Sequence, residues 1–427
     1  MSALREFIAS QTPPGWTTKP LWSLFRRRKL TGYEDEELLS VYRDYGVIPK
    51  SSRDDNHNKE SDDLSGYQLV TEGALVTNKM KAWQGSIAIS RYRGIVSPAY
   101  YVYEPLSSEC DQFLHYLLRS EPYIALYGRI SKGVRVSQWD LEHEALRNVP
   151  VMLPDFTIQK AIADFLDQET VRIDQLIERK QRLIALLNER SMAAIEEAIS
   201  ASARPSKLGH HVKIIPGYAF QSANFSTDDN DIRLLRGANV SPGAIRWDDT
   251  VYWPHDLAHG LESFRLAEGD IVMGMDRPWV SGGIRVAELT SSDVPSLLLQ
   301  RVCKIVPLRT MAKDFLKLML SSKRFLGYFE PELTGVSVPH ISGDQIARFS
   351  FPYIAVEEQI ERARSCSAVL TANERISSMA QRSIERLREL RGALITAAVT
   401  GQIDISSWGK RGHPDRRLDE IQEAMHV

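Results

Sequence analysis

Two long segments of the chain carry apolar residues at the spacing of a single helical stripe. The first runs from about Ile158 to Ile199 without glycine or proline, and its stripe contains Ile158, Ile162, Phe165, Ile173, Leu176, Leu183 and Leu187. The second follows Pro352, and its stripe contains Val356, Ile360, Ile376, Ala380, Ile384, Leu387 and Leu394. Spacings of three, four and seven residues predict two amphipathic helices, each about 60 Å long at about 40 residues.

Neither helix can be stable alone, because a narrow apolar stripe must be buried against something. We therefore expect the two helices to pair as a long antiparallel two-helix coiled coil. The alternative is two separate helices that each cap a domain. Gly401 is a plausible C-terminal cap for the second helix, and Gly392 should weaken that helix locally.

The segments before each helix, residues 14–154 and 206–352, mix short β-like runs with Gly, Pro, Asn and Asp turn signals. Short helices are expected at 111–127 and 312–329. The predicted fold class is α/β (α+β), with two globular domains separated by the helices. The boundaries predicted are 1–154 and 201–352 for the domains, 155–200 and 353–402 for the spacer helices, and 403–427 for a C-terminal tail.

The chain repeats itself once, with a period of about 200 residues. Five segments match in order at offsets between 196 and 202: Glu72–Val76 with Glu268–Val272, Gly85–Ile89 with Gly282–Val286, Phe113–Ser120 with Phe315–Ser322, Gly133–Val136 with Gly335–Val338, and Leu153–Pro154 with Phe351–Pro352. Each match is weak alone, but their shared order predicts a pseudo-two-fold internal repeat.

Length and composition fit a globular protein of two or more domains: 427 residues, 43% hydrophobic and 25% charged. The longest apolar runs are too short to predict a membrane span, and the N-terminus does not have the pattern of a secretion signal. The three cysteines, Cys110, Cys303 and Cys366, are too far apart for CxxC zinc spacing, and their low number favours a cytoplasmic location. The net charge of −2 counts mildly against nucleic-acid binding, unless basic charge is gathered on one face or supplied by partners.

Familiar catalytic motifs are missing from the sequence. Ser281-Gly282-Gly283 does not fit GxGxxG, no Asn-Pro-Pro-aromatic motif follows, and no GxxxxGK[ST] phosphate loop occurs. His210-His211 lacks the spacing of a zinc protease, so it is expected at a surface. These gaps favour a binding protein that has no catalytic residues and holds no cofactor or metal itself. A single-chain methyltransferase or nuclease with an atypical site, or a coiled-coil scaffold that binds proteins, remains the alternative.

Four segments carry a family resemblance. They are Gly46–Lys50 with Asn78–Lys81 and Gly94–Tyr103; Gly269–Met273 with Gly283–Ala287; the closing elements Pro154–Ile162 and Pro352–Ile360; and Leu390–Gln402. Over about residues 14–402 the chain resembles the specificity (S) subunits of type I restriction-modification enzymes. The first repeat departs from the family's pattern at its helix end, where Met192–Ser200 replaces a stretch that usually contains glycine.

The resemblance implies a role in DNA methylation and restriction without catalysis by this chain. In that family each globular domain is a target recognition domain that reads one half of a split, asymmetric double-stranded DNA target. The paired helices hold the halves apart and dock two methyltransferase (M) subunits, which bind S-adenosylmethionine. Motor-nuclease (R) subunits join for cleavage.

Basic and amide side chains in turn-like segments are the candidate DNA contacts. Arg and Asn can pair with guanine and adenine edges, whereas Lys suits phosphate. Any one of them can equally be a solvated surface charge, and the basic run Arg26–Lys29, in an expected helix or turn, is as well explained by a structural role. The candidates are Asn78, Lys79, Lys81, Arg91, Tyr92, Arg93, Lys132, Arg135, Arg233, Arg236, Asn239, Arg277, Trp279, Lys323 and Arg324.

Overall fold

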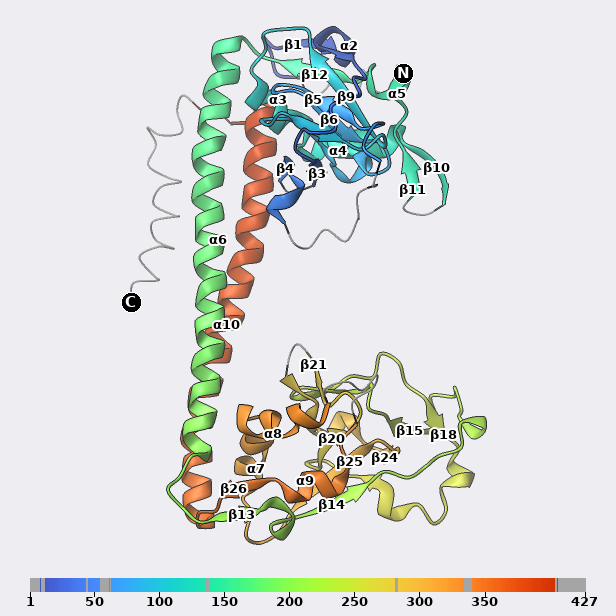
Figure 1. The fold of residues 1–427 in the computed structure, drawn as a ribbon, viewed down its shortest axis with the longest axis vertical. Helices are drawn as coiled ribbons and strands as arrows, with labels where there is room; N and C mark the ends of the chain where they lie inside the picture. The colour runs from blue at the N-terminus through green and yellow to red at the C-terminus, as the bar shows by residue number, and fades with distance from the viewer. Residues whose placement is uncertain are drawn as a thin grey trace. The chain divides into compact units, whose positions relative to one another are not determined.

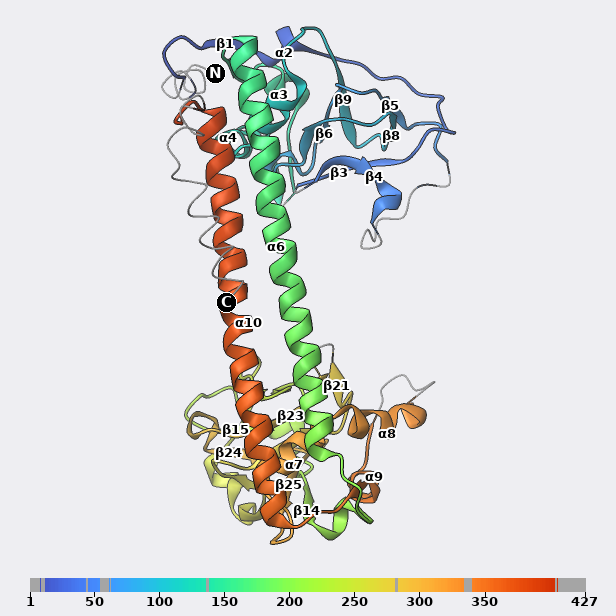
Figure 2. The ribbon, with the colours of Figure 1, turned by 90° about the vertical axis from the view of Figure 1, so that its left-hand side faces the viewer.

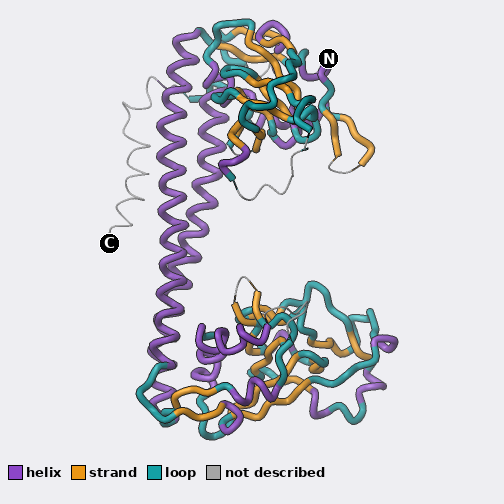
Figure 3. The backbone as a smooth tube through the Cα atoms, in the orientation of Figure 1, coloured by secondary structure: helices purple, strands orange, loops and turns teal. Residues whose placement is uncertain are grey.

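The computed structural model describes residues 8, 12–43, 45–53, 61, 63–135, 138–280, 283–333, 340–403 and 405. The chain divides into two compact units: Met1–Arg179 with Arg382–Val427, and Lys180–Gln381. In both units a run of strands precedes the short helices α3–α5 or α7–α9, so the fold is α+β (Figure 3). Among the described residues, no helix is both long enough and apolar enough to cross a membrane.

Both predicted long helices are present: α6 (Phe156–Ile199) and α10 (Val356–Val399), each of 44 residues. The division between the units falls inside both helices, so each unit contains a segment of α6 and a segment of α10, side by side (Figures 1 and 2). In the first unit, Arg391 Nε lies 3.0 Å from Asp174 Oδ1. In the second, Asn373 Nδ2 donates to Ser191 Oγ at 2.9 Å and Arg362 donates to Ala198 O at 3.4 Å. Partner numbers rise in one helix as they fall in the other, so the segments are antiparallel.

The first unit is built on an antiparallel sheet in the order β2-β9-β6-β7, formed by Phe25–Arg27, Tyr100–Pro105, Leu75–Asn78 and Ile87–Ile89. Its smaller strand pairs are β1 (Thr17–Pro20) with β12 (Pro150–Leu153), β3 (Leu39–Tyr42) with β4 (Gly46–Pro49), β5 (Gln68–Val70) with β8 (Gly94–Val96), and β10 (Lys132–Arg135) with β11 (Gln138–Asp140). Its shorter helices are α2 (Leu21–Leu24), α3 (Asp111–Leu118), α4 (Glu121–Ile130) and α5 (His143–Leu146).

The second unit has an antiparallel sheet in the order β14-β25-β20-β23, formed by Val212–Pro216, Val302–Pro307, Ile271–Gly274 and Val286–Glu288. A second four-stranded sheet has the order β18-β15-β24-β19, formed by Tyr252–Trp253, Ile232–Leu235, Ser296–Leu298 and Arg265–Leu266. The strand pairs are β13 (Pro205–Lys207) with β26 (Ser350–Pro352), β16 (Val240–Ser241) with β17 (Ala244–Ile245), and β21 (Trp279–Val280) with β22 (Gly283–Ile284). The shorter helices are α7 (Lys313–Leu320), α8 (Lys323–Leu333) and α9 (Gly343–Arg348).

The two units repeat one topology. In each, the third strand of the main sheet, β6 or β20, follows a positive-φ glycine, Gly73 or Gly269, and pairs with β9 or β25. A helix pair follows β9 or β25 along the chain: α3–α4 in the first unit and α7–α8 in the second. Each pair turns at a buried serine whose hydroxyl donates to the carbonyl oxygen three residues earlier, Ser120 to Leu117 and Ser322 to Met319, both at 2.7 Å. The two short helices expected near 111–127 and 312–329 are therefore helix pairs.

Two of the five sequence matches are out of register. Thr77 pairs with Ile87, whereas the equivalent Met273 pairs with Val286, so Ile87 corresponds to Val286 and not to Ile284. Beside the equivalent strand pairs β1–β12 and β13–β26, Leu21 N donates to Val149 O at 2.9 Å and Leu208 N donates to Phe349 O at 2.8 Å. The equivalent acceptors Val149 and Phe349 are 200 positions apart, whereas the sequence match of Pro154 with Pro352 has an offset of 198. The Gly133–Gly335 match falls partly outside the described residues.

Candidate nucleic-acid interface

The loops that follow β6 and β20 are equivalent and attached in the same way. Leu141 N donates to Lys79 O, and Ile341 N donates to Met275 O, both at 2.9 Å. Each bond ties the loop to the segment that returns toward the long helix. Because the backbone frames match, the side chains on these two loops are where the units can differ in what they bind.

The loop of the first unit carries an amide and two lysines. Asn78 Oδ1 accepts from Met80 N at 3.1 Å, and Trp83 packs on Trp139 with ring centroids 4.9 Å apart. Lys79 is half-buried and Lys81 is exposed, and in the described part of the chain neither has an ion-pair partner. Their charge is therefore available to an anionic ligand.

The loop of the second unit carries arginines. Arg277 is exposed and has a positive φ of 42°. Its neighbour Asp276 is held between Arg301 Nη1 and His340 Nδ1, each 2.6 Å from a carboxylate oxygen. Burial raises the pKa of Asp276, but the hydrogen bonds from Arg301 and His340 outweigh it and hold this pKa below its usual range. Sequence reasoning missed Arg301 because only the β20–β25 pairing brings it to Asp276. Trp279 packs half-buried against the core, which is a structural role.

Three of the predicted contacts in the first unit are tied to neighbours. Arg91 Nε donates to Gln112 Oε1 at 3.1 Å, and Arg91 Nη2 lies 3.5 Å from Asp167 Oδ2. Arg93 pairs with Glu36 at 2.7 Å. Lys132 lies 4.0 Å from Glu142 Oε2. The ring of Tyr92 is 41% exposed and is free to stack. Arg135 lies in β10, but its side chain is outside what the structure describes.

In the second unit, three predicted contacts support a loop instead of facing outward. Arg233 lies over Trp247, 4.6 Å from the ring centroid, and donates to Ser292 O at 2.8 Å. Arg236 pairs with Asp249 at 2.8 Å. The prediction that Asn239 contacts DNA needs correction, because its side chain is only 2% exposed. Its amide bonds Arg236 N, Arg246 O and Asp249 O, at 3.1, 2.9 and 3.1 Å, and so holds the loop together.

Lys323 and Arg324 begin α8 and are exposed, without an ion-pair partner among the described residues. Lys323 N donates to Glu196 Oε1 at 2.6 Å, which fixes the start of α8 against α6 within the second unit. The backbone that carries both side chains is therefore fixed, and their exposed positive charges are available to an anionic ligand.

The basic run Arg26–Lys29 is partly in strand β2 and not in a helix. Arg26 and Arg28 both pair with Glu104 on the neighbouring strand β9, and Arg27 lies 4.4 Å above the centroid of the Tyr101 ring. These cross-strand contacts give the run a structural role.

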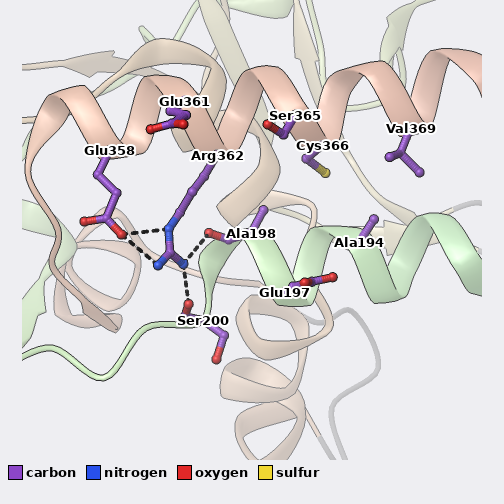
Figure 4. Close-up of a pocket in the computed structure, with 10 residues that line it drawn as sticks. All are labelled: Ala194, Glu197, Ala198, Ser200, Glu358, Glu361, Arg362, Ser365, Cys366 and Val369. Atoms are coloured by element: carbon purple, nitrogen blue, oxygen red, sulfur yellow. Dashed lines mark hydrogen bonds and ion pairs between the residues drawn. The ribbon is translucent and has the colours of Figure 1, made fainter.

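A groove in the second unit lies between the end of α6 and the start of α10 (Figure 4). Its centre is Arg362, which donates to Glu358 Oε1 at 2.9 Å, to Ala198 O in the last turn of α6 and to Ser200 O just beyond that helix. The guanidinium therefore caps α6, whose final carbonyls lack helical partners. Burial raises the pKa of Cys366 in the wall, which keeps the thiol neutral.

Fold and site together define a class: a duplicated α+β protein whose two units present equivalent loops with unlike basic side chains. Residues 14–186 match the family model described as the type I restriction modification DNA specificity domain. Over 80% of its length the chain is similar to a type I specificity subunit, as its sequence indicated.

Three relatives illustrate the similarity. The specificity subunit of the type I restriction enzyme EcoAI from Escherichia coli is 32% identical over 194 residues, which is 45% of this chain and 32% of that subunit. The chain thus aligns with about a third of the EcoAI subunit's length. The MjaVIII specificity subunit of Methanocaldococcus jannaschii is 23% identical over 80% of this chain and 84% of its own length. The EcoBI specificity subunit of E. coli is 26% identical over 44% of this chain and 37% of its own.

Two solved structures share the fold. One, described as the structural basis of complex assembly and conformational transition of the type I R-M system, has a TM-score of 0.70 at 15% identity and covers 92% of this chain and 99% of its own. The other is the HsdS subunit from Thermoanaerobacter tengcongensis, with a TM-score of 0.51 at 16% identity over 92% of this chain and 98% of its own.

Proposed function

We propose that this chain is the DNA-sequence specificity subunit of a type I restriction-modification complex and is not itself catalytic. Each unit acts as a target recognition domain for one half of a bipartite, asymmetric target in double-stranded DNA. The long helices pair as an antiparallel coiled coil that holds the two domains apart. They dock two methyltransferase subunits, which supply S-adenosylmethionine and methylate adenine, and motor-nuclease subunits join for cleavage.

One observation carries the proposal: two equivalent loops on one repeated framework bear different recognition chemistry. The first has Asn78 with Lys79 and Lys81, and the second has Arg277 beside the Asp276–Arg301 pair. An amide suits an adenine edge, a guanidinium suits guanine, and lysine suits phosphate. Two readers of this kind should recognise two different half-sites. The names of the relatives support the same role.

Joining the two readers explains how a chain of net charge −2 can select DNA. Each reader alone offers few open cations, so its affinity is low. When both are held on one spacer, binding of the second half-site becomes intramolecular and occurs at a high effective concentration. Methyltransferase subunits that contact phosphate would add the remaining, salt-dependent affinity.

The test is selection of DNA ligands by the assembled complex. The chain is co-purified with its methyltransferase subunits and used to enrich duplexes from a randomised pool at two salt concentrations. We expect one motif of two unlike halves separated by a fixed gap. Enrichment of no motif, or of a motif that is unchanged when this chain is left out, would contradict the proposal and favour a protein-binding scaffold.

A further inference from the structure

Gln159 and Gln359, which lie 200 residues apart in the first turns of α6 and α10, make matching hydrogen bonds in the two units. They are 1% and 0% exposed. Gln159 Oε1 accepts from Cys110 N at 2.9 Å, and Gln359 Oε1 accepts from Ala312 N at 2.8 Å. Cys110 and Ala312, whose backbone N–H groups make these bonds, directly precede α3 and α7.

The NH2 group of each side-chain amide donates to the corner of its unit, the turn of chain just before the long helix (Pro154 before α6, Ile354 before α10). Gln159 Nε2 donates to Pro154 O at 2.9 Å, and Gln359 Nε2 donates to Ile354 O at 2.9 Å. A second acceptor completes each site: Glu109 Oε2 at 2.7 Å in the first unit and Thr310 O at 3.1 Å in the second. Each glutamine therefore links three parts of one unit: the long helix, its corner and the start of α3 or α7.

These links lie where the sheet-bearing part of each unit meets its own long helix. Phe113 of α3 and Phe315 of α7 are fully buried in the cores that include the main sheets. Apolar packing of the long helix on this core is non-directional and leaves the angle between them weakly specified. Hydrogen bonds have narrow distance and angle ranges, so a buried glutamine with all its partners in place fixes that angle.

We infer that Gln159 and Gln359 are positioning residues that set how each recognition loop is aimed, and through it which gap between half-sites is accepted. The inference rests on the proposed function. One base pair added to the gap moves a half-site by about 3.4 Å and turns it by about 35°, since a DNA turn holds about 10 base pairs. Rigid units cannot follow such a change, whereas units that pivot on their helices can.

The experiment uses the complex assembled with its methyltransferase subunits. Methylation rates are measured on duplexes that carry the natural gap, one base pair fewer and one base pair more. The variants are Gln159→Leu, Gln359→Leu and the double substitution, which keep side-chain bulk and remove both hydrogen-bonding groups. We expect the wild-type preference for the natural gap to fall about tenfold or more in each single variant, with both half-site sequences unchanged.

Gln68→Leu is the matched control. Gln68 is also buried, at 3% exposure, and its Nε2 donates to Tyr100 O at 2.8 Å, but its bonds lie within the sheet region and do not reach α6. This variant should lose stability without losing gap preference. If Gln159→Leu does not assemble, Gln359→Leu in the other unit makes the same test.

The outcomes separate the two claims. If the glutamine variants slow methylation equally on all three gaps, the glutamines only stabilise the fold and the inference is wrong. The same holds if Gln68→Leu lowers the preference for the natural gap as much as the Gln159 and Gln359 variants do. If wild-type complex methylates no two-part target at all, the proposed function itself is wrong.

Discussion

Arg277 and Arg301 lie on neighbouring loops of the second unit and, of the non-glycine residues that the structure describes, they alone have positive φ, at 42° and 67°. The loops are joined where Met275 N donates to Arg301 O at 2.9 Å. Positive φ is costly for a residue with a β-carbon, and such strain is concentrated at binding sites, where the surrounding structure maintains it. We therefore expect the second unit to read its half-site at the edge formed by the end of β20 and the start of β25.

Arg277→Ala should change what the second unit reads. The exposed guanidinium is free to make two bonds to a guanine edge, and its loss should cost about 1–3 kcal/mol at one base pair. Binding of duplexes substituted at each position of the target measures this as relaxed selectivity at one position of one half-site. Arg309→Ala, an exposed residue beyond the other end of β25, is the control. Equal effects of the two substitutions would contradict the assignment.

Lys79→Gln with Lys81→Gln should weaken DNA binding of the complex uniformly across sequences. If both lysines neutralise phosphates, the slope of log affinity against log salt should become shallower by about 2. Titrations at four salt concentrations give this slope. Arg147→Gln, which removes a cation already paired with Glu144 at 3.4 Å, should leave the slope unchanged. A double variant with the wild-type slope would exclude these lysines as phosphate contacts.

Asn373 and Ser191 form a polar contact between α10 and α6 in the second unit. Asn373 is 3% exposed and donates to Ser191 Oγ at 2.9 Å and to Leu187 O at 3.4 Å. Asn373→Ala should lower the free energy of unfolding by about 1–2 kcal/mol. A double-mutant cycle with Ser191→Ala, measured by urea unfolding, should give a coupling energy of about 0.5 kcal/mol or more. Additive losses would show that the contact contributes nothing specific.

His115 should make the first unit sensitive to acid. Burial, followed by the charge of Arg119, lowers the pKa of His115 to about 3. Nδ1 lies 3.2 Å from Ile89 O and Nε2 lies 2.6 Å from Arg119 Nη1, an arrangement that suits the neutral ring. In the unfolded chain this histidine takes up a proton near pH 6.5. Stability is therefore complete above pH 6.5 and is lost as the pH falls toward 3, by up to about 1.4 kcal/mol per pH unit.

His115→Gln keeps a donor and an acceptor but cannot titrate. Urea unfolding between pH 7.5 and pH 4.5 should show a shallower loss of stability in this variant than in the wild-type chain. His143 and His211, whose pKa values are also lowered by burial, remain in both proteins and cancel in the comparison. Parallel curves would mean that His115 does not contribute to the acid loss.

The long helices could be predicted from sequence because a 3.6-residue stripe is a local signal. The match of Ser120 with Ser322 was also correct, because both helix pairs turn at this hydroxyl. Register across the sheet was not predictable to the residue. The loop between β20 and β23 is longer than the one between β6 and β7. The sequence match allowed for only one extra residue there, so it placed Ile87 two positions from its counterpart, Val286.

The candidate site was harder to predict because chemistry-bearing residues meet through strand pairing. Arg26 gave no sign of its partner Glu104, which lies 78 positions away, and Arg301 gave none of Asp276. Asn239 has the side chain of a base reader, but its burial depends on the backbone that folds around it. Residue type alone does not separate an amide that binds a ligand from one that holds a loop.

The most direct test of the central claim is long-read methylation mapping in cells that express this chain with its methyltransferase subunit, compared with cells that lack this chain. We expect methyladenine at one split motif with two unlike halves, absent without the chain. We also expect that Arg277→Ala relaxes one half only, while the Lys79 and Lys81 substitutions leave the motif unchanged. A methylation pattern that does not depend on this chain would contradict its role in choosing the DNA target.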